Sequence, residues 1–321
     1  MAVRVAVLDD YGSVARGLGP WERLDGRADV EFIAEHLAGE DALAARLAGV
    51  AIVVAMRERT PFPRSLLRRL PDLRLLVTTG MVNASIDLDA ARDHGVLVCG
   101  TSSRGAAPAE LTWALILGLV KQVREEDAAV QAGGWQQGVG GDLEGRRLGL
   151  LGLGRLGRRV AAVGRAFGME VVAWSANLTD EAAREAGAVR AGLDELLRTA
   201  HVVSIHLRLS ERTRGLLGAR ELALMRPDAV LVNTSRGPIV DEAALVAALE
   251  RGAIAGAGLD VFDVEPLPQG HPLRTLPNVL RTPHLGYVSE ATFRTMFADA
   301  VEDVEAFLDG APVRVLGGSQ G

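Results

Sequence analysis

The sequence predicts an α/β protein built from two doubly wound parallel sheets. Short apolar, β-branched segments alternate with segments of helical periodicity along the whole chain, which is typical of parallel strands joined by helical crossovers. A glycine-rich turn at residues 152–157 separates a strand-like run from a helix-like one near the middle of the chain. At 321 residues the chain is long enough for two domains, each with its own core.

The first third of the chain carries five strand candidates. These strands are expected at residues 3–8, 30–33, 50–56, 73–78 and 96–98. Helices are expected between them at residues 41–47, 63–70 and 87–94, and Asp87 has the residue type of an N-cap. A long helix, expected at 108–130, is apolar nearly all round in its first part and should be buried against a large neighbour.

The rest of the chain repeats the alternation. Beyond the strand that ends at the glycine turn, strands are expected at residues 171–174, 202–207, 230–232, 254–259 and 278–282. Helices are expected at 158–167, 180–186, 221–225, 241–250 and 290–308, the last folding back on the first domain. We therefore expect one domain from residues 1–101 plus 286–321 and another from 102–285, with a ligand cleft between them.

The glycine-rich turn reads Gly152-Leu153-Gly154-Arg155-Leu156-Gly157, a G-x-G-x-x-G pattern between a strand and a helix. In a dinucleotide-binding (Rossmann) domain the first glycine makes the tight turn and the second lets backbone approach a pyrophosphate. The third packs the helix closely on its strand. The pyrophosphate meets the free N–H groups of that helix. An ordinary βα turn is the alternative, and the strand before and helix after favour the dinucleotide.

Composition and charge exclude several classes of protein. The net charge of −6 lacks the basic excess that phosphate-contacting nucleic-acid binders need. Lys121 is the only lysine among the 35 basic residues, which excludes a Walker-type phosphate loop and disfavours Schiff-base catalysis. Cys99 is the only cysteine, and the histidines show no metal-ligand spacing, so no metal site is expected. No signal peptide or membrane span is recognisable, so we expect a cytoplasmic protein with no membrane partner.

Three polar side chains follow successive strands near the end of the second domain: Arg236, Glu265 and His284. The carboxyl ends of parallel strands meet at one edge of a sheet, so these side chains are expected to converge. A guanidinium holds a carboxylate and its neighbouring carbonyl, and a histidine paired with a carboxylate exchanges a proton at neutral pH. Together they suit hydride transfer at a 2-hydroxy or 2-keto acid. Singly, each has a structural explanation as a solvated arginine, a loop carboxylate or a strand-end histidine.

In these motifs the chain resembles the D-isomer-specific 2-hydroxyacid dehydrogenases, which include phosphoglycerate, glyoxylate/hydroxypyruvate and D-lactate dehydrogenases. The resembling segments are residues 152–157, 233–241, 258–266 and 282–286. The resemblance implies a Rossmann NAD(P)-binding domain and a flavodoxin-like substrate domain. It also implies D-2-hydroxyacid dehydrogenase or 2-keto acid reductase activity, with Arg236 orienting the substrate, His284 as acid/base and Glu265 as its partner. A homodimer joined through the helix at 108–130 is implied as well.

The ligand contacts are expected along the carboxyl edges of the two sheets. The cofactor set is Gly152, Gly154, Arg155, Leu156, Gly157, Ser175, Asn177, His206, Thr213, Thr234, Ser235, Arg236, Asp260, His284 and Gly286. By the resemblance, Asp260 contacts the nicotinamide carboxamide. The substrate set is Gly80, Met81 and Arg236.

One departure leaves the coenzyme open between NAD and NADP, with NAD favoured. NAD sites usually carry an acid about 20 residues beyond the glycines, on the ribose hydroxyls. Here Ser175 and Asn177 occupy that strand end, and Asp180 and Glu181 look like first-turn helix residues. A dinucleotide-sensing, corepressor-like binding protein of the same fold stays open as an alternative without turnover. Arg57 and Arg59 are interpreted as a solvent-exposed loop paired with Glu58, with an anion site as the alternative.

Overall fold

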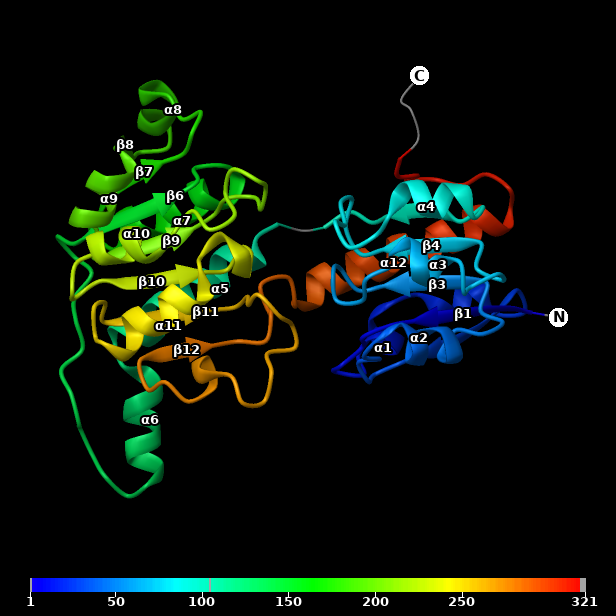
Figure 1. Cartoon of the computed structure of the whole chain (residues 1–321), viewed down its shortest axis with the longest axis horizontal. Helices are drawn as coiled ribbons and strands as arrows, with labels where there is room; N and C mark the ends of the chain where they lie inside the picture. Colours follow the sequence, from blue (N-terminus) through cyan, green and yellow to red (C-terminus); the bar gives the residue numbers. More distant parts are fainter. Residues whose placement is uncertain (1, 104, 318–321) are drawn as a thin grey trace. The chain divides into compact units, whose positions relative to one another are not determined.

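The computed structural model describes residues 2–103 and 105–317. The chain divides into two compact units, with boundaries after residues 104 and 288. The sequence placed these boundaries after residues 101 and 285. Unit 1 combines the N-terminal segment with the C-terminal one, and unit 2 is a single continuous stretch between them (Figure 1).

Unit 1 is built on a five-stranded, wholly parallel sheet in the order β2-β1-β3-β4-β5. Its strands are β1 Val3–Val7, β2 Ala28–Phe32, β3 Ile52–Ala55, β4 Leu75–Thr78 and β5 Leu97–Gly100. The three strands in the middle of the order are apolar and buried along most of their length because helices cover both faces. Cys99 on β5 is fully buried, and burial raises its pKa to about 12, so it acts as a small apolar group.

The helices of unit 1 lie on both sides of that sheet (Figure 1). One face carries α2 Glu40–Arg46, α3 Arg64–Leu67 and α4 Leu88–Asp93, and the other carries α1 Ala15–Leu18, η1 Trp21–Leu24 and α12 Glu290–Leu308. Asp87 caps α4 by accepting a hydrogen bond from the Ala90 amide at 2.8 Å, as its residue type predicts. After α12 the chain pairs with the edge of β5 through an antiparallel bridge between Val315 and Cys99.

Unit 2 contains a seven-stranded parallel sheet in the order β12-β11-β10-β9-β6-β7-β8. Its strands are β6 Arg147–Leu151, β7 Glu170–Trp174, β8 Val189–Arg190, β9 Val202–Ile205, β10 Val230–Asn233, β11 Gly256–Leu259 and β12 Val279–Arg281. The order reverses at β6 and β9, which are neighbours, and this reversal is the switch point at which doubly wound folds bind ligands.

Two apolar cores lie on opposite faces of the unit 2 sheet. One core packs α5 Ala107–Val120, α7 Arg155–Ala166 and α8 Asp180–Glu185 against the strands, and the other packs α9 Leu193–Thr199, α10 Ala219–Leu224 and α11 Glu242–Glu250. Two short 3-10 turns, η2 Gly237–Ile239 and η3 Pro272–Arg274, follow β10 and precede β12. Both units are thus parallel α/β layers, which confirms the predicted fold class.

The single helix predicted at 108–130 is wrong. The structure has α5 and a separate α6 Val123–Gln131, broken at Gln122, whose φ of 54° lies in the left-handed region. The break is stabilised from both sides: Gly141 donates its N–H to the Val120 carbonyl, and Arg124 donates to the Val279 carbonyl at 2.8 Å. No helix or strand was predicted at α1, η1, β8 or α9.

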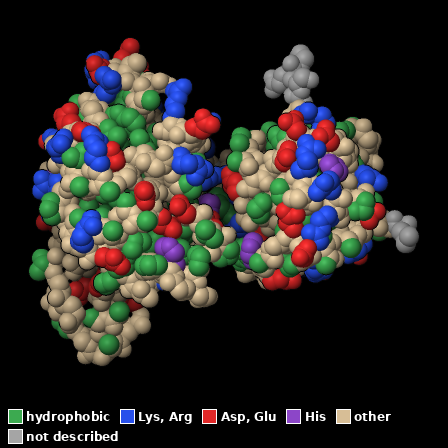
Figure 2. Space-filling model, in the orientation of Figure 1, with side chains coloured by type: hydrophobic (Ala, Val, Ile, Leu, Met, Phe, Trp, Pro, Cys, Tyr) green, Lys and Arg blue, Asp and Glu red, His purple; other side chains and the backbone are tan. Residues whose placement is uncertain are grey.

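Charges of both signs are interspersed over the face of each unit seen in the space-filling view, with no broad patch of one sign (Figure 2). Within the described residues, no helix is long and apolar enough to cross a membrane.

A buried carboxylate holds the C-terminal segment to α12 within unit 1. Asp303 is 0 % exposed, and Arg314 donates Nε–H to its Oδ1 at 3.1 Å. Its Oδ2 is buried and has no hydrogen-bond partner among the residues that the structure describes. Burial raises the pKa of Asp303 to about 7, although Arg314 acts in the opposite direction.

We expect Asp303→Asn to change how stability depends on pH. A folded-state pKa above the unfolded value of 3.8 means that the folded chain binds a proton more tightly. Its contribution is therefore fully present below about pH 4 and is lost as pH rises towards 7. Asparagine does not titrate, so the variant does not lose this stability as pH rises. From pH 4 to 7 the unfolding free energy of wild type should therefore fall relative to that of the variant. Urea unfolding across this range measures it.

Asp309→Asn is the matched control, because Asp309 is exposed and paired with Arg27. Parallel pH dependences for wild type and Asp303→Asn would contradict the assignment.

Candidate active site

The glycine turn of unit 2 has one open glycine and two enclosed ones. A Cβ on Gly152, whose φ is +102°, would lie 2.6 Å from the His206 carbonyl oxygen, and a Cβ on Gly157 would lie 2.2 Å from the Gly152 carbonyl oxygen. A Cβ on Gly154 would have no heavy atom within 4 Å among the neighbours considered. Gly154 is the N-cap residue of α7, without a side-chain cap. The turn thus leaves backbone N–H groups and free space together, as a pyrophosphate requires.

The loop after β10 is held by Asn233. Its side chain donates to the Arg236 carbonyl at 2.9 Å and accepts from the Ser235 amide at 3.0 Å. Gly237 packs so closely on the next loop that a Cβ would lie 2.1 Å from the Phe262 carbonyl carbon. Arg236, which donates to the Ser235 carbonyl at 2.7 Å, is therefore fixed beside the loop that carries Glu265.

His284 and Glu265 form a direct pair. The His284 Nδ1 lies 2.6 Å from Glu265 Oε2, and Glu265 Oε1 accepts from the Phe262 amide at 2.9 Å. Their side chains are 17 % and 29 % exposed, so the pair is shielded yet reachable. The Tyr287 ring stands edge-on to the imidazole, with 5.5 Å between ring centroids. One nitrogen of His284 thus faces a carboxylate, which leaves Nε2 for proton exchange.

The other residues expected at the cofactor have local partners. His206 lies 2.9 Å from the Ser204 hydroxyl, and burial lowers its pKa to about 4, which keeps it neutral. Thr213 accepts from the Ser210 amide at 2.8 Å, and Thr234 contacts Thr112 of α5 at 2.8 Å. Ser235 donates to the Leu207 carbonyl.

The end of β7 carries no carboxylate before α8. Ser175 opens a turn that the Leu178 amide closes by donating to its carbonyl at 3.2 Å, and Asn177 is exposed within that turn. Asp180 is the first residue of α8 and pairs with Arg190 at 3.4 Å, as a first-turn acid. Arg155 lies at the first position of α7, with its guanidinium against Gly105.

In unit 1 the substrate residues expected from the resemblance follow β4. Gly80 has φ +136°, and a Cβ there would lie 2.2 Å from Arg57 Nη1. Arg57 donates to the Thr79 carbonyl at 3.1 Å and is only 21 % exposed, so its interpretation as a solvent-exposed side chain is wrong. The predicted pairing with Glu58 is present, with 3.7 Å between Arg57 Nε and Glu58 Oε2. Met81 is 47 % exposed. Arg59 lies over the Tyr11 ring, 4.4 Å from its centroid.

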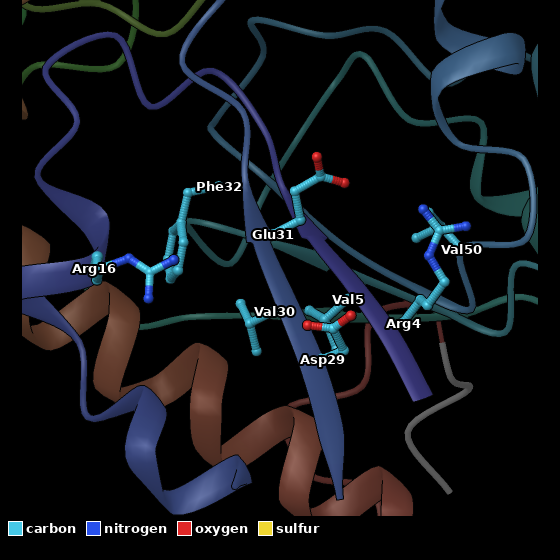
Figure 3. A pocket seen from close by; sticks show the side chains of 8 residues that line it. All are labelled: Arg4, Val5, Arg16, Asp29, Val30, Glu31, Phe32 and Val50. Atoms are coloured by element: carbon cyan, nitrogen blue, oxygen red, sulfur yellow. The ribbon is translucent and has the colours of Figure 1, made fainter. Parts of the chain in front are cut away.

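A cavity of about 510 Å³ lies elsewhere in unit 1, over β1 and β2 (Figure 3). Three of its charged lining residues have partners: Arg4 donates to the Ala48 carbonyl, Arg16 lies over the Phe32 ring, and Glu31 pairs with Arg46. This cavity has none of the strand-end groups described above, so it is not the candidate site.

The profile described as the D-isomer specific 2-hydroxyacid dehydrogenase NAD binding domain matches residues 113–286. This chain belongs to that family. A glyoxylate reductase of Aeropyrum pernix is 42% identical over 255 residues, which cover 76% of each chain. A D-3-phosphoglycerate dehydrogenase of Bacillus subtilis is 36% identical over 261 residues, which cover 80% of this chain and 50% of that protein.

Among solved structures, a putative D-3-phosphoglycerate dehydrogenase oxidoreductase from Ralstonia solanacearum superposes with a TM-score of 0.93. It is 38% identical, and the match covers 98% of this chain and 96% of that one. As a member of the D-2-hydroxyacid dehydrogenase family, the chain is an oxidoreductase that acts on CH–OH donors with a nicotinamide dinucleotide.

Three residues next to the proposed site were not predicted from the sequence. Asn233 holds the loop after β10, the Thr282 hydroxyl donates to Asp260, and the Tyr287 ring packs on His284. Asn233 and Thr282 stand inside the quoted motifs, at the ends of β10 and β12, and that position was the available signal. Nothing in the sequence distinguishes Tyr287 as a ring packed against a histidine.

Alanine substitutions at the glycine turn should separate ligand binding from folding. Gly154→Ala adds a methyl group where ligand would lie. We therefore expect the Kd for NADH to rise by about tenfold or more while Tm stays unchanged. Gly157→Ala forces a methyl group against backbone and should lower Tm by several degrees. NADH fluorescence titration and thermal unfolding measure the two effects. Equal Tm losses in both variants would contradict this division.

Proposed function

We propose that the protein is a 2-keto acid reductase, or D-2-hydroxyacid dehydrogenase in the reverse direction, with His284 as the acid/base. The observation that carries the proposal is the 2.6 Å contact between His284 Nδ1 and Glu265 Oε2, at the carboxyl edge of the sheet that also bears the dinucleotide turn. Glyoxylate and hydroxypyruvate are the first substrates to test, because relatives include proteins named glyoxylate reductase and glyoxylate/hydroxypyruvate reductase B.

The pair suits proton transfer to a keto oxygen. When bound, the nicotinamide supplies the hydride to the keto carbon or accepts it from the hydroxy carbon. In reduction, the doubly protonated imidazole of His284 donates its Nε2 proton to the keto oxygen. Nδ1–H stays hydrogen-bonded to Glu265, whose carboxylate stabilises the charged ring and selects the tautomer that remains afterwards. Oxidation reverses the proton transfer.

Arg236 is assigned to the substrate carboxylate and carbonyl. Its backbone is held from two sides, by the Asn233 amide and by the packing of Gly237 on Phe262. A rigidly held guanidinium presents paired donors to a carboxylate, which orients the keto carbon and polarises its carbonyl. By the family resemblance, the Gly80 and Met81 backbone of unit 1 is assigned to substrate binding.

For the coenzyme we favour NAD. The turn at Gly152–Gly157, with Arg155 and Leu156 at the start of α7, would hold the pyrophosphate, and Ser175 and Asn177 would meet the adenosine ribose. The missing acid at the end of β7 removes the usual repulsion of a 2′-phosphate, so NADPH belongs in the same assay.

The first measurement is oxidation of NADH and of NADPH with glyoxylate, hydroxypyruvate, phenylpyruvate and branched 2-keto acids. We expect turnover with at least one of them. His284→Gln should lower kcat by about 10³-fold, and Glu265→Gln and Arg236→Lys by about 10²-fold, because each removes a group acting on the reacting atoms or on the imidazole.

His271→Gln is the matched control. His271 also pairs with a glutamate, Glu242, at 3.1 Å, but neither residue belongs to the proposed active site. Wild-type rates in both His284→Gln and Arg236→Lys would refute the site. Tight dinucleotide binding without turnover on any substrate would favour the sensor alternative.

We also propose that α6 and the segment after it contact a second copy of this chain. None of the nine residues of α6 is buried, and an isolated helix of that length is unstable in water without packing. Figure 1 shows α6 projecting beyond the sheet of unit 2. Its Val130 and the following Trp135 and Val139 are 53 %, 72 % and 92 % exposed, a concentration of apolar surface that an interface between copies would bury.

Light scattering on size-exclusion peaks tests this assembly. We expect wild type to have twice the chain mass of 33.9 kDa and the variant Val139→Asp to shift towards the monomer, because a buried unpaired carboxylate is costly. Val189→Asp, at another exposed valine on the edge strand β8, should leave the mass unchanged. A monomeric wild type would refute the proposal.

A further inference from the structure

Asp260 is a fully buried carboxylate directly after β11. Its Oδ1 accepts hydrogen bonds from the Thr282 hydroxyl at 2.5 Å and the Leu285 amide at 2.6 Å. Its Oδ2 accepts from the Gly286 amide at 2.8 Å. The three donors come from both sides of His284, so a single carboxylate spans the loop that carries the imidazole.

The loop at His284 needs such support. His284 has a φ of 55°, a left-handed conformation that costs free energy for a residue with a side chain. The His284 amide donates to the Thr282 carbonyl at 3.0 Å, and this bond holds only the part of the turn that precedes His284. The two amides that follow His284 are both taken up by Asp260. Without the carboxylate they would be left in a partly buried loop with no acceptor, and the turn would relax.

The fit between Asp260 and this loop is close. A Cβ on Gly286 would lie 3.1 Å from Asp260 Oδ2 and 3.7 Å from the Pro108 Cβ, so a side chain there would crowd the contact. Burial raises the pKa of Asp260, while the hydrogen bonds from Thr282, Leu285 and Gly286 act to lower it. A carboxylate accepts about four hydrogen bonds, and these three leave room for one more.

We propose that Asp260 is a positioning residue, which locks the loop 282–286 so that the His284 ring faces Glu265. This role rests on the function proposed above and is separate from a contact with the nicotinamide carboxamide. The geometry predicts that loosening the loop slows catalysis without weakening coenzyme binding, since the loop aims the imidazole and the glycine turn holds the dinucleotide.

Thr282 offers a test that leaves Asp260 itself in place. Thr282→Val removes one donor to the carboxylate, and we expect kcat at saturating substrate and coenzyme to fall by about tenfold, with the NADH Kd within about twofold of wild type. Thr282→Ser restores the hydroxyl and should restore kcat. Asp260→Asn, which places an NH2 group opposite an amide donor, should lose roughly 10²-fold. Thr199→Val, at an exposed hydroxyl on α9, is the control without effect.

A second readout does not depend on turnover. Amide hydrogen exchange at Leu285 and Gly286 should be slow in wild type and in Thr282→Ser, and faster in Thr282→Val and Asp260→Asn. If wild type has no activity on any substrate, the proposed function fails while exchange still tests the loop lock. Unchanged exchange in Asp260→Asn would overturn the positioning role. So would a Thr282→Val enzyme that keeps its kcat but binds NADH more weakly, since Asp260 would then act through the coenzyme alone.

Discussion

The hydrogen-bond register between β10, β11 and β12 is the constraint on which the site of unit 2 depends. Asn233 is paired with Leu259, and Leu259 with Arg281, so the last residues of the three strands lie in one row. Residues a few positions beyond that row must therefore lie on neighbouring loops. A shift of one register position would separate His284 from Glu265 and turn buried side chains towards the wrong face.

Backbone geometry and side-chain chemistry are divided between different residues in this site. Gly152 and Gly157 are enclosed by backbone, whereas Gly154 borders open space, so the turn is rigid where it supports the sheet and free where a ligand would lie. In the same way, Asn233 and Asp260 hold loops through main-chain groups, while Arg236 and His284 are the residues proposed to act on the substrate. The groups proposed to react are thus held in place by neighbouring side chains.

The sequence predicted most of this arrangement because its main signals are local. Apolar runs and helical spacing found every strand of the two sheets except β8, and the predicted bounds 290–308 agree with α12. What it missed depends on backbone conformation or distant packing. Gln122 breaks a helix by adopting positive φ, which no residue preference at glutamine indicates. Arg57 looked solvent-exposed in its charged loop, yet it packs on Gly80, a glycine that offers the space. The hydrogen bonds to Asp260 come from 22 to 26 residues further along the chain.

The discontinuous construction of unit 1 bears on how the chain folds as it is synthesised. One face of its sheet is covered by α12, and the edge of β5 is paired by residues that follow α12. Both elements leave the ribosome after the whole of unit 2, which is continuous in sequence. The whole of unit 2 is therefore synthesised before unit 1 is complete, although the first segment of unit 1 is synthesised before unit 2. Until α12 is made, the part of the unit 1 sheet that it covers stays exposed in the growing chain, with only α1 and η1 on that face.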